Sequence, residues 1–84
     1  MRPRSRGSVR LASDNPRAPA RIDPNYLSET ADLVVLTDGV ALARDIGAGT
    51  AFAEWRAEEI YPGPGWANIA TQHDFIRRAA NSFH

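Results

Sequence analysis

The N-terminal part of the chain alternates apolar and polar positions. In residues 5–11 the apolar residues Val9 and Leu11 fall on one face, and Arg6, Ser8 and Arg10 fall on the other. This period of two predicts a short, half-buried strand. Gly7 within the strand indicates a bulge or the close approach of another backbone segment. Within the chain, residues 20–23 are the stretch that could pair back on this strand, and a hairpin of two strands is marginal alone in water. The sequence therefore predicts an incomplete sheet.

The rhythm changes to spacings of three and four between residues 27 and 48, which predicts an amphipathic helix of about four to five turns. Ser28 or Thr30 is its expected start, and Gly47 and Gly49 provide its stop. The expected buried stripe consists of Leu33, Val35, Leu36, Val40, Leu42, Ala43 and Ile46. The expected opposite, polar face carries Thr37, Asp38, Arg44 and Asp45. Gly39 lies on the apolar arc at a cost of about 1 kcal/mol relative to alanine, which suggests contact with another backbone.

The last third of the chain has weaker patterns. Residues 51–55 fit one short helical turn, whereas residues 60–66 contain too much proline and glycine for a regular element. Thr71 and Asp74 resemble a capping box, which predicts a final helix from Thr71 to about residue 80. Its apolar face comprises Phe75, Ile76, Ala79 and Ala80. These elements together predict an α+β fold: an incomplete domain with a short N-terminal strand or hairpin and two helices, part of a larger antiparallel-sheet domain.

Size and composition narrow the possibilities. The 84 residues allow one domain at most, and a chain of this length buries only about 60% of its unfolded surface. It has no cysteine, so neither a disulfide nor a thiolate metal site can add stability. No apolar run is long enough to span a membrane, and the arginine-rich N-terminus lacks the apolar stretch of a secretory signal. We therefore expect a cytoplasmic location and no membrane partner.

The net charge of zero hides an asymmetry. Residues 1–21 carry six arginines and one acid, for a charge of +5, whereas residues 22–84 carry four arginines and nine acids, for −5. A basic arm can bind nucleic acid. Here the arginines are spread out by the strand pattern and by prolines rather than clustered on one face, so we expect no nucleic-acid partner. The arm is better explained by an acidic or polar surface of a larger parent protein.

Five sequence blocks stand in an order that identifies a family. They are Pro3–Leu11 (PRSRGSVRL), Ile22–Leu27 (IDPNYL), Ala31–Arg44, Phe52–Gly63 and Thr71–Ala80. The first two, at this separation, are the most specific, whereas the helix pattern alone is common in protein cores. In this order and over nearly the whole chain, the blocks resemble the C-terminal, substrate-binding domain of the glucose-methanol-choline (GMC) family of FAD-dependent oxidoreductases.

The resemblance implies that residues 1–84 form part of such a C-terminal domain, without the flavin-binding domain. It implies oxidation of the CH–OH group of a small alcohol to a carbonyl, with hydride passing to FAD in the intact enzyme. The dinucleotide-binding glycine fingerprint is missing from the sequence. We therefore expect this chain alone to bind no cofactor and to be inactive, with the missing flavin-binding part as a possible partner. The alternative is a non-catalytic interaction module that docks through its amphipathic helix.

The family's catalytic base is a histidine near the flavin, and the resemblance carries this role to His84, which follows Phe83. His84 can also occupy the aromatic position just before that histidine, and the sequence leaves both registers open. A positioned imidazole suits this task because it accepts a hydroxyl proton near neutral pH. The family's second catalytic histidine or asparagine has no counterpart in the chain.

Other candidates have simpler explanations. His73 is expected at the surface in the first turn of the last helix, without a metal-ligand partner. The carboxylates of Glu54, Glu58 and Glu59 are expected on a solvated face. Three aromatic residues can either line a substrate entrance or anchor their loop, and we favour anchoring; they are Trp55, Tyr61 and Trp66. No serine has a base partner nearby in the sequence, and no metal site is expected.

Overall fold

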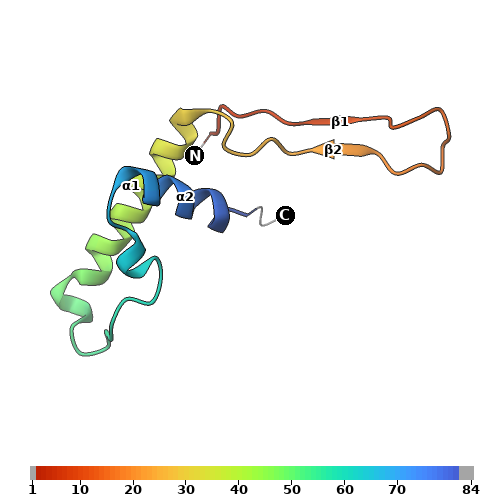
Figure 1. Cartoon of the computed structure of the whole chain (residues 1–84). Coiled ribbons are helices and arrows are strands. Elements are labelled where there is room, and N and C mark those ends of the chain that lie inside the picture. Colours follow the sequence, from red (N-terminus) through yellow and green to blue (C-terminus); the bar gives the residue numbers. More distant parts are fainter. Residues whose placement is uncertain (1, 82–84) are drawn as a thin grey trace. The chain divides into compact units, whose positions relative to one another are not determined.

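The structure is a computed structural model, and it describes residues 2–81. Two strands, β1 (Ser8–Arg10) and β2 (Arg21–Asp23), precede two helices, α1 (Thr30–Ala48) and α2 (Ile69–Ala79) (Figure 1). Two single turns of 3₁₀ helix, η1 (Thr50–Phe52) and η2 (Gly63–Gly65), lie between the helices. The hairpin and two helices confirm the predicted α+β class. The chain forms two compact units, the first ending at Asp32 and the second beginning at Leu33.

The strands of the first unit form a two-stranded antiparallel hairpin in which Val9 lies opposite Ile22. This pairing confirms that residues 20–23 return to the N-terminal strand. The expectation of a half-buried strand was wrong, because all six strand residues are exposed, Val9 by 71% and Ile22 by 68%. Among the described residues no third strand extends the hairpin. The apolar side chains that the alternation marked are present, but nothing described covers them.

Gly7 makes the close backbone approach that its sequence position indicated. A Cβ atom at this position would lie 2.6 Å from the carbonyl oxygen of Pro24 and 2.7 Å from its carbonyl carbon, with the Asp23 oxygen nearer still. The opposing turn is fixed by Asn25, whose backbone N–H donates to Asp23 Oδ1 at 3.0 Å and whose Nδ2 donates to the Arg6 carbonyl at 2.8 Å. Only a residue without a side chain fits between these segments.

Helix α1 begins at Thr30, one of the two expected starts, and ends at Ala48. Its buried side centres on Leu33, which is 2% exposed, with Leu36 and Val40 half-buried. Thr37 lies on this same side, where its hydroxyl donates to the Leu33 carbonyl at 2.8 Å. The prediction of Thr37 on the polar face was therefore wrong, since a residue four positions after Leu33 shares its face.

The other half of the expected stripe on α1 is exposed. Val35, Leu42 and Ile46 are 46%, 62% and 57% exposed. Gly39, which lies between them, has no atom within 4 Å of the place where a Cβ would stand. The expected backbone contact at Gly39 is thus not made by any described residue. One broad buried arc was the wrong description: the helix has a covered apolar side and an uncovered one.

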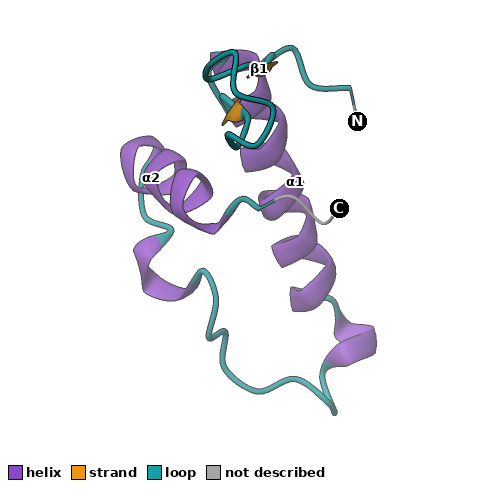
Figure 2. Cartoon of the chain, turned by 90° about the vertical axis from the view of Figure 1, so that its right-hand side faces the viewer, coloured by secondary structure: helices purple, strands orange, loops and turns teal. Residues whose placement is uncertain are grey.

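The segment after α1 leaves the helix end, runs in a wide arc and leads to α2 (Figure 2). The predicted short turn is confirmed by η1, where the N–H groups of Trp55 and Arg56 both donate to the Phe52 carbonyl. The expectation of no regular element in residues 60–66 was wrong, because a single 3₁₀ turn, η2, forms at Gly63–Gly65. The Trp66 N–H donates to the Gly63 carbonyl.

Helix α2 begins at Ile69 with Asn68 as its N-cap, three residues before the cap that the sequence suggested. The Asn68 side chain accepts from the N–H groups of Ala70 and Thr71, and the Asn68 N–H donates to the Thr71 hydroxyl. Thr71 is therefore the third helical residue of the capping box and not its first member. Asparagine is as strong a cap as serine or aspartate, and here its side chain satisfies two backbone N–H groups at the start of the helix.

The hydrophobic core is thin. Among the described residues the buried hydrophobic side chains are Leu27, Leu33 and Ile76. Leu27 reaches its buried position with a left-handed backbone, φ 57°, at the end of the turn that leads into α1.

Candidate functional site

The first candidate is the junction between the N-terminal segment and the start of α1, both in the first unit. The Asp32 carboxylate accepts hydrogen bonds from the backbone N–H groups of Arg4 (2.8 Å to Oδ1) and Ser5 (2.7 Å to Oδ2), and from the Ser5 hydroxyl. Ser5 Oγ in turn accepts from the Glu29 N–H at 3.1 Å. Ser5 thus has a structural role, because its hydroxyl links the Asp32 carboxylate to the Glu29 backbone.

The Asp32 side chain lies in the first turn of α1, where a negative charge is also stabilised by the helix dipole. The hydrogen bond from the Ser5 hydroxyl, followed by those from the Arg4 and Ser5 amides, lowers the pKa of Asp32. The residue is buried, with 9% of its surface exposed. This ionised carboxylate joins the block Pro3–Leu11 to the helix, while Gly7 and Asn25 join the same block to the turn of Ile22–Leu27. The two most specific sequence blocks are therefore in direct contact.

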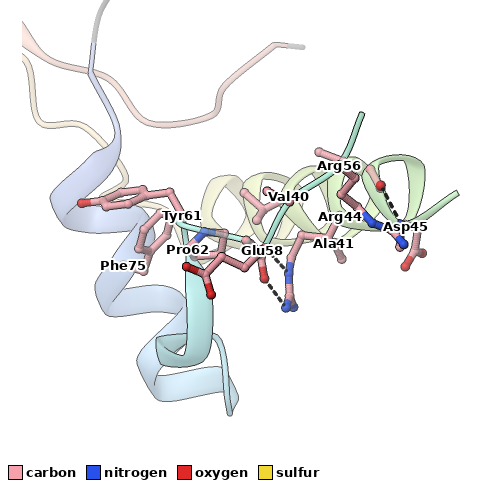
Figure 3. A pocket seen from close by; sticks show the side chains of 14 residues that line it. Val40, Ala41, Arg44, Asp45, Arg56, Glu58, Tyr61, Pro62 and Phe75 are labelled. Atoms are coloured by element: carbon pink, nitrogen blue, oxygen red, sulfur yellow. Dashed lines mark hydrogen bonds and ion pairs between the residues drawn. The ribbon is translucent and has the colours of Figure 1, made fainter. Parts of the chain in front are cut away.

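The second candidate is a hollow in the second unit, shown in Figure 3, with a volume of about 990 Å³. The C-terminal half of α1 forms one wall and residues 56–62 form the other, with Phe75 of α2 at one end. Across it, the Arg44 guanidinium holds the Glu59 carboxylate with two bonds, Nε–Oε1 at 2.7 Å and Nη2–Oε2 at 2.9 Å. Arg44 therefore faces a partner segment. Glu54, Glu58 and Glu59 are exposed, as the sequence predicted, but Glu59 is also paired with Arg44.

The ion pair satisfies both of its members. The hydrogen bonds from Arg44 lower the pKa of Glu59, and Glu59 raises the pKa of Arg44. Glu59 is thus held ionised and is not a proton acceptor tuned to neutral pH. A second arginine, Arg56, donates from Nη1 to the Gly47 carbonyl at 3.1 Å near the end of α1. Both contacts fasten residues 56–59 to the helix.

Two of the three aromatic candidates meet on one ring. The Phe75 ring lies 5.2 Å from that of Tyr61 and 5.8 Å from that of Trp66, the latter edge-on at 86°. Both geometries are favourable for aromatic pairs, so these residues anchor their loop on α2, as the sequence suggested. Trp55 does not join them and is 86% exposed.

The remaining candidates do not assemble into a catalytic centre within the described residues. His73 lies in the second turn of α2, half-buried, with a buried Nε2 atom that has no hydrogen-bond partner, so the expectation of a surface histidine was wrong. No cluster of histidine, cysteine and carboxylate ligands suitable for a metal occurs in residues 2–81. His84, the predicted base, lies outside the described residues.

Three structural contacts escaped the sequence reasoning. Asn68 had a readable signal, because asparagine three residues before Thr71 fits a capping box. For Asp32, nothing local in the sequence marks a partner 27 residues away. Arg44 and Glu59 are separated by 15 residues and an irregular segment, and no periodicity links them.

Comparison with known proteins assigns the chain to a family. The family model described as GMC oxidoreductase matches residues 3–84. Choline oxidase of Arthrobacter globiformis is 37% identical over 83 residues, covering 96% of this chain and 15% of that enzyme. Pyridoxine 4-oxidase of Microbacterium luteolum is 36% identical, covering 98% and 16%. Alcohol dehydrogenase [acceptor] of Pseudomonas putida is 40% identical over 62 residues, covering 74% and 11%. The chain belongs to the GMC oxidoreductase family and matches its C-terminal domain.

The chain spans about 15% of the length of the first of these relatives. Members of this family depend on FAD, but the described residues do not form a cradle for it. A dinucleotide pyrophosphate needs a glycine-rich turn between a strand and the N-terminus of a helix. The turn from β2 to α1, residues 24–29, contains no glycine, and Gly47 and Gly49 stand at the C-terminal end of α1.

Among the described helices, none is long and apolar enough to cross a bilayer.

Proposed function

We propose that this chain is the substrate-side part of an FAD-dependent oxidoreductase that oxidises the CH–OH group of a small alcohol. In the intact enzyme, bound FAD would supply the acceptor for the hydride of the CH–OH group, and a base of the protein would take the hydroxyl proton, so that the alcohol becomes a carbonyl compound. The family match over residues 3–84 carries the proposal. The named donors of the relatives differ, so the proposal extends to the alcohol class and not to one alcohol.

The proposal places the flavin site outside these 84 residues. The relatives are several times longer than this chain, so they have room for a separate flavin-binding part. The support is that the turn from β2 to α1 contains no glycine, so the described residues offer no pyrophosphate cradle there. The isolated chain then has no cofactor and no activity. Titrating FAD with the 84-residue chain and following flavin fluorescence tests this, and saturable quenching would contradict it.

A segment exchange tests the main proposal. Residues 3–84 replace the matching segment of the Arthrobacter globiformis choline oxidase, and the purified chimera is examined for bound flavin and for anaerobic bleaching of the flavin by choline and other alcohols. We expect a flavin-loaded protein that an alcohol reduces. A folded chimera that contains flavin but is bleached by no alcohol would contradict the proposed reaction.

For the base, we propose His84. In an active chimera, His84→Gln should slow flavin reduction about 10²–10⁴-fold, the usual contribution of a positioned general base. His73→Gln is the matched control, because it makes the same substitution at the other histidine of the chain, which we do not propose as the base, and it should leave the rate unchanged. An undiminished rate in His84→Gln would assign the base to the other register.

A further inference from the structure

The uncovered side of α1 differs from an ordinary solvent-facing helix surface. Residues 35, 39, 42 and 46 follow spacings of four, three and four, so they form one continuous stripe along the helix. At 100° per residue this stripe lies opposite the buried side formed by Leu33 and its neighbours. We call it the outer stripe: Val35, Gly39, Leu42 and Ile46. All four of its residues belong to the second unit.

A surface helix normally has one apolar side and one polar side, whereas a helix that is apolar on opposite sides is typical of the interior of a larger protein. The three side chains of the outer stripe are each between 46% and 62% exposed, and the stripe is bounded on one side by Asp38 and Asp45. Gly39, at its centre, leaves an opening in which another backbone can approach closely. The stripe has the composition of a contact surface rather than of a solvated one.

We propose that the outer stripe docks on the flavin-binding part of the enzyme. This inference rests on the proposed function, which supplies the occupant. The argument for that occupant is length: the chain corresponds to about 15% of a relative such as choline oxidase, so a body several times larger is available to cover the stripe. A helix with one side covered by its own chain and the other by this body is buried between two layers.

Two neighbouring valines make the test specific. Val34 and Val35 are equally exposed, at 45% and 46%, but Val35 lies on the outer stripe and Val34 lies 100° away around the helix. Val35→Gln and Val34→Gln therefore make the same chemical change in and out of the proposed contact. In the choline oxidase chimera, Val35→Gln should reduce the flavin-loaded yield several-fold, because an amide side chain would be buried without a partner. Val34→Gln should leave it unchanged.

Gly39→Leu adds a steric test. In the chimera it should abolish flavin retention, because a large side chain would occupy the space of the approaching backbone. In the isolated chain it should leave the far-ultraviolet circular dichroism as helical as before, since nothing described lies near this position. Equal flavin yields for Val35→Gln, Val34→Gln and Gly39→Leu would overturn the proposal.

The isolated chain provides a second measurement, which does not depend on the chimera. Val35→Gln should lower the binding of a hydrophobic dye more than Val34→Gln does, without loss of helix. Loss of helix on Val35→Gln alone would show that the stripe is already covered, which refutes the proposal. A dimer in sedimentation that Leu42→Gln dissolves and Val34→Gln does not would make a second copy the occupant and also refute it. If the chimera with an unchanged outer stripe holds no flavin, that result counts against the proposed function. The docking proposal is then decided by dye binding, helix content and sedimentation of the isolated chain.

Discussion

Replacing Gly7 by alanine should separate the two most specific blocks of the sequence. The new Cβ would lie 2.6 Å and 2.7 Å from the carbonyl oxygen and carbon of Pro24, whereas real Cβ atoms essentially never come within 3.0 Å of a neighbour. The clashing atoms are backbone atoms and cannot rotate away as a side chain would. Their turn is also held by both hydrogen bonds of Asn25. Relief therefore requires that the hairpin and the turn move apart.

Two opposing terms set the size of the effect. Alanine restricts the unfolded chain and by itself would stabilise the fold by about 0.4–1 kcal/mol. Forcing an extra methyl group into a closely packed site costs about 1–3 kcal/mol. The free energy of unfolding of the first unit should therefore fall by about 1–2 kcal/mol, a large share of what a small domain possesses.

The assay is a urea titration followed by two-dimensional amide spectra, because the signals of Val9 and Ile22 report on the hairpin directly. Gly39→Ala is the matched control. It makes the same substitution at an open position of α1 and should stabilise the helix by about 1 kcal/mol through helix propensity. If Gly7→Ala leaves the hairpin signals as resistant to urea as in the parent chain, the close approach at Gly7 is refuted.

Three further predictions concern charges and caps. Because hydrogen bonds lower the pKa of Asp32 in the folded state, its contribution is complete above the unfolded value of about 3.9 and is lost as pH falls through the folded pKa. Urea midpoints measured between pH 2 and 6 should therefore drop at acid pH, and the part of this drop caused by Asp32 should disappear in Asp32→Asn. Arg44→Gln should raise the pKa of Glu59 toward its ordinary value in a carbon-detected titration, with a small change in urea midpoint because the pair is partly exposed; an unchanged Glu59 titration would refute the pairing. Asn68→Ala should destabilise α2 by about 1 kcal/mol, whereas Asn68→Asp should retain the cap, as measured by helicity in urea; equal losses in both variants would contradict the capping role.

The parts of the fold that the sequence predicted are those specified by local rules. Alternation around Val9 located the first strand, and the glycine within it marked the backbone contact with Pro24. Spacings of three and four located α1 and its start at Thr30. These signals depend on neighbouring residues, which is why a single sequence was sufficient for them.

Most of what the sequence missed depends on contacts that a local pattern does not identify. The pattern marked Val35 and Leu42 as buried, but a hydrophobic period states only that a side chain should be covered and not which chain covers it. The ion pair of Glu59 with Arg44 was missed because an irregular segment separates the two residues in the sequence. The start of α2 was misplaced because two capping patterns overlap, and the pattern beginning at Asn68 satisfies more backbone groups.

Asp32 has a consequence for anyone who recombines this segment with other enzymes. Residues 4 and 5 supply the three donors that hydrogen-bond its carboxylate and lower its pKa. A splice after Ser5 that brought proline to position 4 or 5, or a residue without a hydroxyl to position 5, would remove donors from a buried anion at the head of α1. The new junction would then be less stable even though no residue of the helix had changed. Crossovers should therefore be placed upstream of Arg4, so that the arm and the helix are inherited together.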